Sequence, residues 1–199
     1  MKPEIEAKFL NVDHDALRVA LHQAGAECVQ PMRLTKRKNY DYPDWRLDRD
    51  KHAWVRVRDS GNQITLDYKQ LDNRDFDGTK EVSIKIDSMD AADAFLQAIG
   101  LVQVNYQETK RESWRLGECE IELDEWPWVK PFLEIEGPDE QAVKDCAAKL
   151  GLDWSQACHG SVEVAYQAEY EVSDEDIDRA PLITFEAPVP EAFEQKRKS

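Results

Sequence analysis

Residues 3–10 read PEIEAKFL, and this stretch decides how the rest of the sequence is interpreted. In an extended strand, Glu4, Glu6 and Lys8 share one face, and the apolar residues between them share the other. The same period of two predicts further strands over residues 32–42, 53–59, 63–70, 80–87, 103–116, 118–125 and 132–137. A set of about eight strands is enough to close a small barrel.

Apolar residues with a period near 3.6 predict helices between and after these strands. One helix is expected from Asp13 to Gly25, a second from Ser88 to Gly100, and later ones over residues 139–150 and 161–170. The turn residues 59–62 predict that segments 53–59 and 63–70 pair as an antiparallel hairpin. We expect a main domain over residues 1–160. Residues 161–199 are expected to form a C-terminal helix and a partly flexible acidic extension, with 182–185 as a candidate short docked strand.

Composition limits the class of protein and its partners. The chain has 199 residues, of which 41% are hydrophobic, and this is enough to form a buried core. Its 41 acidic residues outnumber its 26 Lys and Arg residues, and the net charge of −15 argues against binding nucleic acid or an anionic membrane. No apolar stretch approaches the ~18 residues of a spanning helix, so we expect a cytoplasmic protein. The four cysteines form no CxxC pair and are predicted to be free thiols.

Charged side chains recur on one face of nearly every predicted strand. The basic ones include Arg56 and Arg58, Lys69, Lys85, and Arg111, and the acidic ones include Glu81, Glu120, Glu122, Asp124, Glu134 and Glu136. On any single strand, a solvated outer face explains such a pattern. On a sheet that closes with these faces inward, the cations can bind phosphate oxygens and the carboxylates can hold hard divalent cations.

Several motifs in order resemble the CYTH superfamily, the triphosphate tunnel metalloenzymes. The first is the ExExK pattern formed by Glu4, Glu6 and Lys8. The later ones are Arg56-Val-Arg58, Tyr68-Lys69, Glu81, Lys110-Arg111-Glu112, and the stretches 120–124 and 132–137. The resemblance covers residues 3–137 and leaves the region beyond about residue 160 unexplained.

The resemblance implies an α+β fold: a closed eight-stranded antiparallel β-barrel with helices packed outside. Its tunnel would bind a triphosphate together with Mg²⁺ or Mn²⁺. The implied catalytic and substrate-binding cations are Lys8, Arg56, Arg58, Lys69, Lys85 and Arg111. The implied metal ligands are Glu4, Glu6, Glu81, Asp124, Glu134 and Glu136.

Some positions leave alternatives open. Several relatives carry a lysine two residues before the arginine equated with Arg111, whereas this chain has Thr109 there and Lys110 next to it. Either a bulge turns Lys110 inward or one phosphate contact is missing. Glu122 is a candidate metal ligand or a solvated residue, and Lys85 lies either in the lumen or on the solvent face of an edge strand. The basic cluster 33–38 reads as a solvated face with Arg37 as its candidate inward residue, while the tryptophans of segment 126–128 either stack on a base or pack on the wall.

Three functions fit these patterns. The favoured one is hydrolysis of inorganic triphosphate, thiamine triphosphate or a nucleotide triphosphate such as ATP, because no adenine-specific pocket is recognised. The second is a class IV adenylyl cyclase, in which the ribose hydroxyl of ATP attacks the α-phosphate and diphosphate leaves. The third is a non-catalytic polyphosphate-binding module. The chain is expected to be a monomer or a homodimer.

Overall fold

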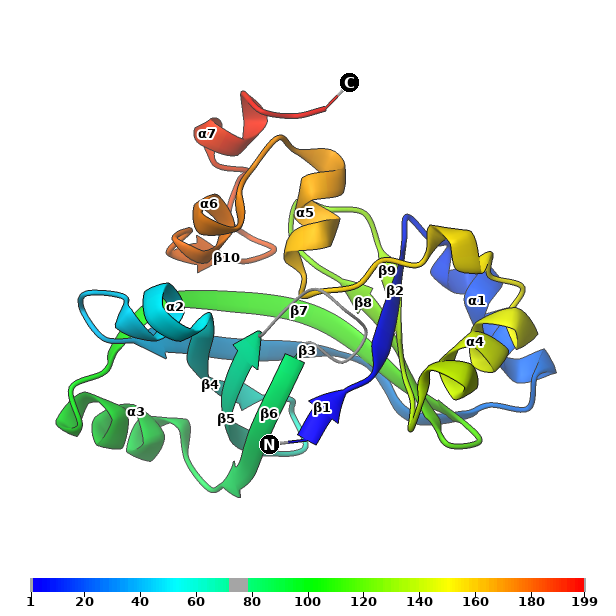
Figure 1. The fold of residues 1–199 in the computed structure, drawn as a ribbon, viewed down its shortest axis with the longest axis horizontal. Coiled ribbons are helices and arrows are strands. Elements are labelled where there is room, and N and C mark those ends of the chain that lie inside the picture. The colour runs from blue at the N-terminus through cyan, green and yellow to red at the C-terminus, as the bar shows by residue number, and fades with distance from the viewer. Residues whose placement is uncertain (1, 72–78, 199) are drawn as a thin grey trace.

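The computed structural model describes residues 2–71 and 79–198 (Figure 1), and for residues 2–4 and 79 only the backbone is described. The strands are β1 (Lys2–Glu4), β2 (Glu6–Leu10), β3 (Glu27–Asp41), β4 (Ala53–Asp59), β5 (Ile64–Leu71), β6 (Thr79–Ile86), β7 (Val102–Leu116), β8 (Cys119–Glu125), β9 (Phe132–Glu136) and β10 (Leu182–Ile183). The helices are α1 (His14–Gln23), α2 (Arg46–Lys51), α3 (Met89–Ala98), α4 (Glu140–Lys149), α5 (Glu163–Glu169), α6 (Asp174–Asp178) and α7 (Glu191–Glu194), with a 3-10 turn at Trp154–Gln156.

The strands form one curled sheet in the order β1-β6-β5-β4-β3-β7-β8-β9-β2. All neighbours along this path are antiparallel. The short strand β10 lies outside the path and runs parallel to β7. The α+β class and the antiparallel pairing predicted from the sequence are confirmed, including the hairpin of β4 and β5.

The expected closed barrel is corrected to an open sheet, because the hydrogen-bonded path has two ends. The strand predicted over residues 3–10 is interrupted at Ile5 and changes its neighbour there. Before Ile5, β1 pairs with β6, and after it β2 pairs with β9. The two ends of the sheet are therefore consecutive pieces of one segment, and no single continuous ladder joins them.

The strand boundaries agree with the predicted ones to within a few residues, apart from β3. This strand begins at Glu27 instead of residue 32. The register shifts between Cys28 and Gln30, and again between Gln30 and Arg33. Such irregularities disturb the period of two, which explains why the sequence pattern missed the first part of the strand.

Polar caps begin the helices that the sequence predicted. The side chains of Asp13, Ser88 and Asp139 accept hydrogen bonds from backbone amides in the first turns of α1, α3 and α4. The helix predicted over 161–170 is confirmed as α5. Helix α2 was missed, because it has no side-chain cap and no buried residue, so no apolar stripe marks it.

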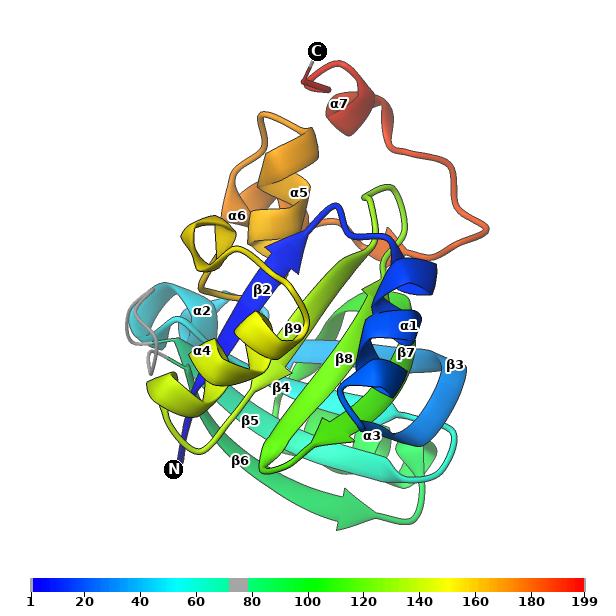
Figure 2. The same cartoon turned by 90° about the vertical axis from the view of Figure 1, so that its right-hand side faces the viewer.

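Helices pack on the outer surface of the sheet in two places (Figures 1 and 2). Helices α1 and α4 cover β2, β8 and β9, where Leu21 and Val143 join a buried cluster with Ile121 and Ile135. At the other end, α3 packs on β3 and β4 through a smaller cluster around Leu96. With the outer face covered by apolar contacts, the charged side chains of these strands are directed to the inner face.

The C-terminal segment after α4 has its own apolar cluster. Helices α5, α6 and α7 and strand β10 gather on one side of the sheet (Figure 1). Tyr166, Ile177 and Ile183 are buried there against Trp126 and Phe132. The docked strand expected within 182–185 is confirmed over two residues, Leu182–Ile183.

Two further sequence predictions can be checked on the described residues. All four cysteines are free thiols. No helix in residues 2–71 or 79–198 has the length and apolar character needed to span a membrane.

Candidate functional site

The strand register places opposite charges side by side on the inner face of the sheet. Lys8 of β2 lies opposite Glu134 of β9. Arg111 of β7 lies opposite Asp124 of β8. In the other half of the sheet, Arg56 faces Asp67, and Lys69 faces Glu81. The interior is therefore built from cross-strand pairs of cations and carboxylates.

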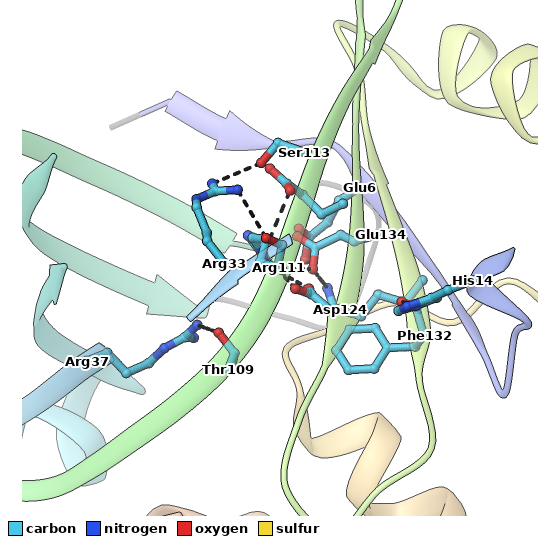
Figure 3. A network of polar contacts seen from close by, with 12 residues as sticks. Glu6, His14, Arg33, Arg37, Thr109, Arg111, Ser113, Asp124, Phe132 and Glu134 are labelled. Atoms are coloured by element: carbon cyan, nitrogen blue, oxygen red, sulfur yellow. Dashed lines mark hydrogen bonds and ion pairs between the residues drawn. The ribbon is translucent and has the colours of Figure 1, made fainter. Parts of the chain in front are cut away.

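The half of the site formed by β2, β7, β8 and β9 centres on Lys8 and Arg111. Figure 3 shows Arg111 close to Asp124, Glu134 and Glu6. Lys8 Nζ lies 2.6 Å from Glu6 Oε1 and 3.6 Å from Glu134 Oε2. Arg111 donates from Nε to Asp124 Oδ1 over 2.7 Å and from Nη2 to the second oxygen of the same carboxylate. Its Nη2 also lies 3.5 Å from Glu134 Oε2. These contacts link both cations to the Glu134 carboxylate.

The carboxyl groups of Glu6 and Glu134 interact closely, and each shifts the pKa of the other. Burial and the charge of Glu134 raise the pKa of Glu6 to about 8. Burial opposes the ionisation of Glu134, yet Lys8 and Arg111 hold the pKa of Glu134 below its usual range. These opposite shifts favour one protonated and one ionised carboxyl group at neutral pH when no cation is bound.

The opposite half of the site is rich in arginine. Arg56 donates from Nε to Asp67 Oδ2 over 2.8 Å, and Ser83 donates to the other oxygen of Asp67 over 2.5 Å. Arg37 donates from Nη2 to Thr109 Oγ1 over 2.8 Å. The buried nitrogens Arg37 Nε, Arg56 Nη2 and Arg58 Nε have no hydrogen-bond acceptor among the described residues.

These arginines repel one another. Burial, followed by the charges of Arg56 and Arg111, lowers the pKa of Arg37 well below its ordinary value. The charge of Arg56 and burial lower the pKa of Arg58 to about 10. A guanidinium remains charged at neutral pH. The lowered pKa values therefore indicate that the excess positive charge in this half of the interior costs folding free energy. A bound anion would relieve this cost.

A cavity of about 250 Å³ opens from this interior. Five arginines and two glutamates line it: Arg33, Arg37, Arg58, Arg111 and Arg115, with Glu120 and Glu122. Burial raises the pKa of Glu122 to about 7. Another hollow, of about 300 Å³, lies at the end of α3, but none of the side chains that line it is charged.

Most of the cations predicted from the sequence lie together on this inner face. Lys85 is the exception. It pairs with the buried Thr65 of β5, but its own side chain is exposed to solvent. Lys110 lies outside: its Nζ is 3.6 Å from Glu125 Oε2 and 4.6 Å from the centre of the Phe185 ring. The register of β7 with β3 runs without a shift from Thr109 through Lys110 to Arg111, so no bulge turns Lys110 inward.

The predicted metal ligands divide into three groups. Glu6, Glu134 and Glu136 lie on facing positions of β2 and β9. Asp124 is held by Arg111, and Glu81 lies 2.9 Å from Lys69 Nζ. The side chain of Glu4 falls outside the described part of the chain. Within residues 2–71 and 79–198, no three acidic, histidine or cysteine side chains converge in the way a metal site requires.

Three inward residues were missed or underrated from the sequence. Arg33 donates to the backbone oxygens of Ser60 and Arg111 and to the Ser113 hydroxyl. Arg37 is 7% exposed, and Asp67 is 1% exposed. The spacing of four between Arg33 and Arg37 and the spacing of two between Asp67 and Lys69 were the available signals, since equal parity places residues on one face of a strand.

The fold and the site together define a class: an α+β protein whose curled antiparallel sheet encloses a charge-paired, arginine-rich interior. Family comparison identifies the particular group. The model of the CYTH domain matches residues 2–161, so this chain belongs to the CYTH family. The resemblance inferred from the sequence motifs is confirmed.

Solved structures share this fold at low sequence identity. A provisionally named adenylate cyclase from Vibrio parahaemolyticus is 20% identical with a TM-score of 0.70, and the match covers 83% of this chain and 98% of that one. The PH1012 protein from Pyrococcus horikoshii is 19% identical with a TM-score of 0.64, covering 77% and 93%. A provisionally named adenylyl cyclase from Hippeastrum, described with a dominant triphosphatase activity, is 15% identical with a TM-score of 0.57, covering 89% and 95%. A search of curated protein sequences finds no significant match.

Proposed function

We propose that this protein is a divalent-metal-dependent enzyme that hydrolyses inorganic triphosphate or the triphosphate group of a small organic molecule. The observation that carries the proposal is the set of buried guanidinium nitrogens on Arg37, Arg56 and Arg58 that have no acceptor among the described residues. Each unsatisfied buried donor costs about 1–3 kcal/mol, so this arrangement favours an anion with many oxygens as its partner.

The surrounding charges support a chain of phosphates over a single one. Lys8 and Arg111 lie in one half of the interior, and Arg56 and Arg58 lie in the other. Neighbouring inward residues on one strand are about 6–7 Å apart, which is closer to the separation of the two outer phosphates of a triphosphate than to that of directly bonded ones. A triphosphate can therefore contact both halves of the site at once.

The residues present fit a hard divalent cation. Glu6 and Glu134 form a buried pair of interacting carboxyl groups, and Glu136 lies on the same face. Mg²⁺ is commonly held by one or two carboxylates plus substrate phosphates and water, and Glu6 and Glu134 can supply these carboxylates. When bound, Mg²⁺ or Mn²⁺ would neutralise phosphate charge and polarise the phosphoryl oxygens, which makes the phosphorus more open to attack.

In the proposed reaction, water attacks the terminal phosphorus and the bond to the bridging oxygen breaks. Orthophosphate leaves together with the second product, which is diphosphate from inorganic triphosphate or the organic diphosphate from an organic substrate. One proton goes to solvent. The side chains of Arg37, Arg58 and Arg111 would stabilise the negative charge that spreads over the phosphoryl oxygens in the transition state.

Hydrolysis is preferred over cyclisation for a structural reason. Cyclisation requires the adenosine of ATP to be held so that its ribose hydroxyl reaches the α-phosphate. Trp114, which lines the arginine cavity, and Trp126, which packs on Arg37, are 3% and 5% exposed and offer no free face to an adenine. The dominant triphosphatase activity described for the Hippeastrum relative points in the same direction.

A product assay tests the proposal. The purified protein is incubated with Mg²⁺ or Mn²⁺ and inorganic triphosphate, ATP or thiamine triphosphate, and the products are separated. Release of orthophosphate that is abolished by chelation supports hydrolysis. Cyclic AMP with an equal amount of diphosphate would instead identify a cyclase, and tight binding without turnover would identify a silent binding module.

Paired variants complete the assay. Arg58→Met removes an inward guanidinium, whereas Lys110→Met removes a cation from the outer face of β7. We expect Arg58→Met to lose most of the activity and Lys110→Met to retain it. Equal effects of the two substitutions would contradict the assignment of the active interior.

A further inference from the structure

We propose that Trp126, held by the C-terminal extension (residues 162–198), positions Arg37 for phosphate binding. This inference rests on the proposed function. The extension lies beyond the matched CYTH domain, which ends at residue 161. The C-terminal extension would thus form part of the phosphate-binding site.

The contacts run in a continuous chain from the extension to the charged interior. Tyr166 of α5 is fully buried, and its ring packs edge to face on Trp126 with 6.4 Å between ring centres. The Tyr166 hydroxyl donates to the backbone oxygen of Pro127 over 3.1 Å. On its other side, Trp126 lies under the guanidinium of Arg37, with 4.5 Å from Cζ to the ring centre.

Arg37 depends on these neighbours because, among the described residues, no carboxylate forms an ion pair with it. It donates from Nη2 to the Thr109 hydroxyl, and its Nε has no acceptor among the described residues. Arg56, Arg111 and Arg58 all repel it. The face of an aromatic ring attracts a guanidinium without neutralising it, so Trp126 can fix Arg37 while leaving its charge for a ligand.

The extension also pairs with the sheet in the row of residues that contains Arg37. Arg37 of β3 pairs with Gln107 of β7, and Gln107 pairs in turn with Ile183 of β10. The neighbouring Asn105 donates to the backbone oxygen of Asp178 over 3.0 Å. The extension thus reaches Arg37 by two routes, through Trp126 and through β10.

The experiment uses the full chain and inorganic tripolyphosphate, with affinity measured by calorimetry. Trp126→Leu removes the aromatic face, and we expect binding to weaken about tenfold. Trp126→Phe keeps a ring that attracts cations less strongly and also removes the buried Nε1, which lacks an acceptor among the described residues. Its affinity should fall between those of the wild type and Trp126→Leu.

A control and a double-variant cycle separate positioning from general loss of packing. Phe193→Leu alters the same apolar cluster without touching Arg37, and it should lower the melting temperature while leaving the affinity unchanged. On an Arg37→Gln background, Trp126→Phe and Trp126→Leu should cause no further loss of affinity, because their effect acts through Arg37.

Different outcomes would refute the positioning role of Trp126 and the proposed function on which it rests. Equal weakening by Phe193→Leu, or an undiminished effect of the Trp126 variants on the Arg37→Gln background, would overturn the positioning role alone. If Trp126→Leu does not fold, Trp126→Phe still decides the question through the same cycle. A wild-type protein that binds no tripolyphosphate would refute the proposed function and this inference with it.

Discussion

Replacing Arg58 by Met should stabilise the unliganded protein and weaken its binding of triphosphate. Arg58 lies on the inner face of β4, and its buried Nε has no acceptor among the described residues. The charge of Arg56 and burial lower the pKa of Arg58 from 12.5 to about 10. The methionine side chain retains much of the apolar volume and removes the positive charge.

The magnitude follows from that pKa. One pKa unit corresponds to 1.36 kcal/mol, so relief of the repulsion is worth at most about 3 kcal/mol at neutral pH. In a chain of this size, each kcal/mol raises the melting temperature by about 2–4 °C. Loss of a charged hydrogen bond to a phosphate should cost about 1.5–3 kcal/mol of binding free energy.

The assay is thermal unfolding of the wild type and Arg58→Met, with and without tripolyphosphate. For the wild type, ligand at about 100 times its dissociation constant should add about 2.7 kcal/mol of stability. Arg58→Met should melt higher than the wild type without ligand and gain less from the same ligand concentration. The control Lys110→Met should stay within about 0.5 kcal/mol of the wild type in both conditions. A lower melting temperature of Arg58→Met with undiminished ligand stabilisation would refute the reasoning.

Three further substitutions test other parts of the structure. Glu6→Gln should lower metal-dependent turnover at least tenfold, on the order of effects at metal sites, and wild-type turnover at matched thermal stability would remove β2 from the site. Thr109→Val removes the acceptor of Arg37 and should weaken tripolyphosphate binding by about 1 kcal/mol in calorimetry, whereas a drop in melting temperature alone would contradict this role. Burial and the charge of Glu163 raise the pKa of Asp178 from 3.8 to about 8, so the folded state binds more protons than the unfolded state between these values. The wild type should lose up to about 1.4 kcal/mol of stability per pH unit as pH rises through this window, and Asp178→Asn should flatten the melting curve against pH; parallel curves would show that Asp178 is not the cause.

Much of the site could be inferred from strand parity. Because successive side chains of a strand point to opposite faces, the spacing of Arg56 and Arg58 and the pattern around Glu134 already indicated which residues share the inner face. The apolar residues on the opposite face then indicated where the helices would pack. These relations depend on local backbone geometry and on the hydrophobic period, so a single sequence carries them.

Pairing between distant strands was beyond the reach of that pattern. Parity placed Asp67 on the face of Lys69, but its contact with Arg56 follows from the register of β4 with β5. Likewise, the exposure of Lys85 depends on what lies next to β6 in space. Sequence alone gives the face of a residue and leaves its neighbours open.

The sequence by itself determined the strand periods, the main helices, the family and most of the inward charges, since each of these is encoded within a few consecutive residues. Only the tertiary structure decided where the first strand changes partners at Ile5, which buried guanidinium nitrogens lack a hydrogen-bond acceptor among the described residues, and that Trp126 lies between Arg37 and Tyr166. These features depend on contacts between segments far apart in the chain. Their geometry is set by packing and register, and no short stretch of sequence specifies it.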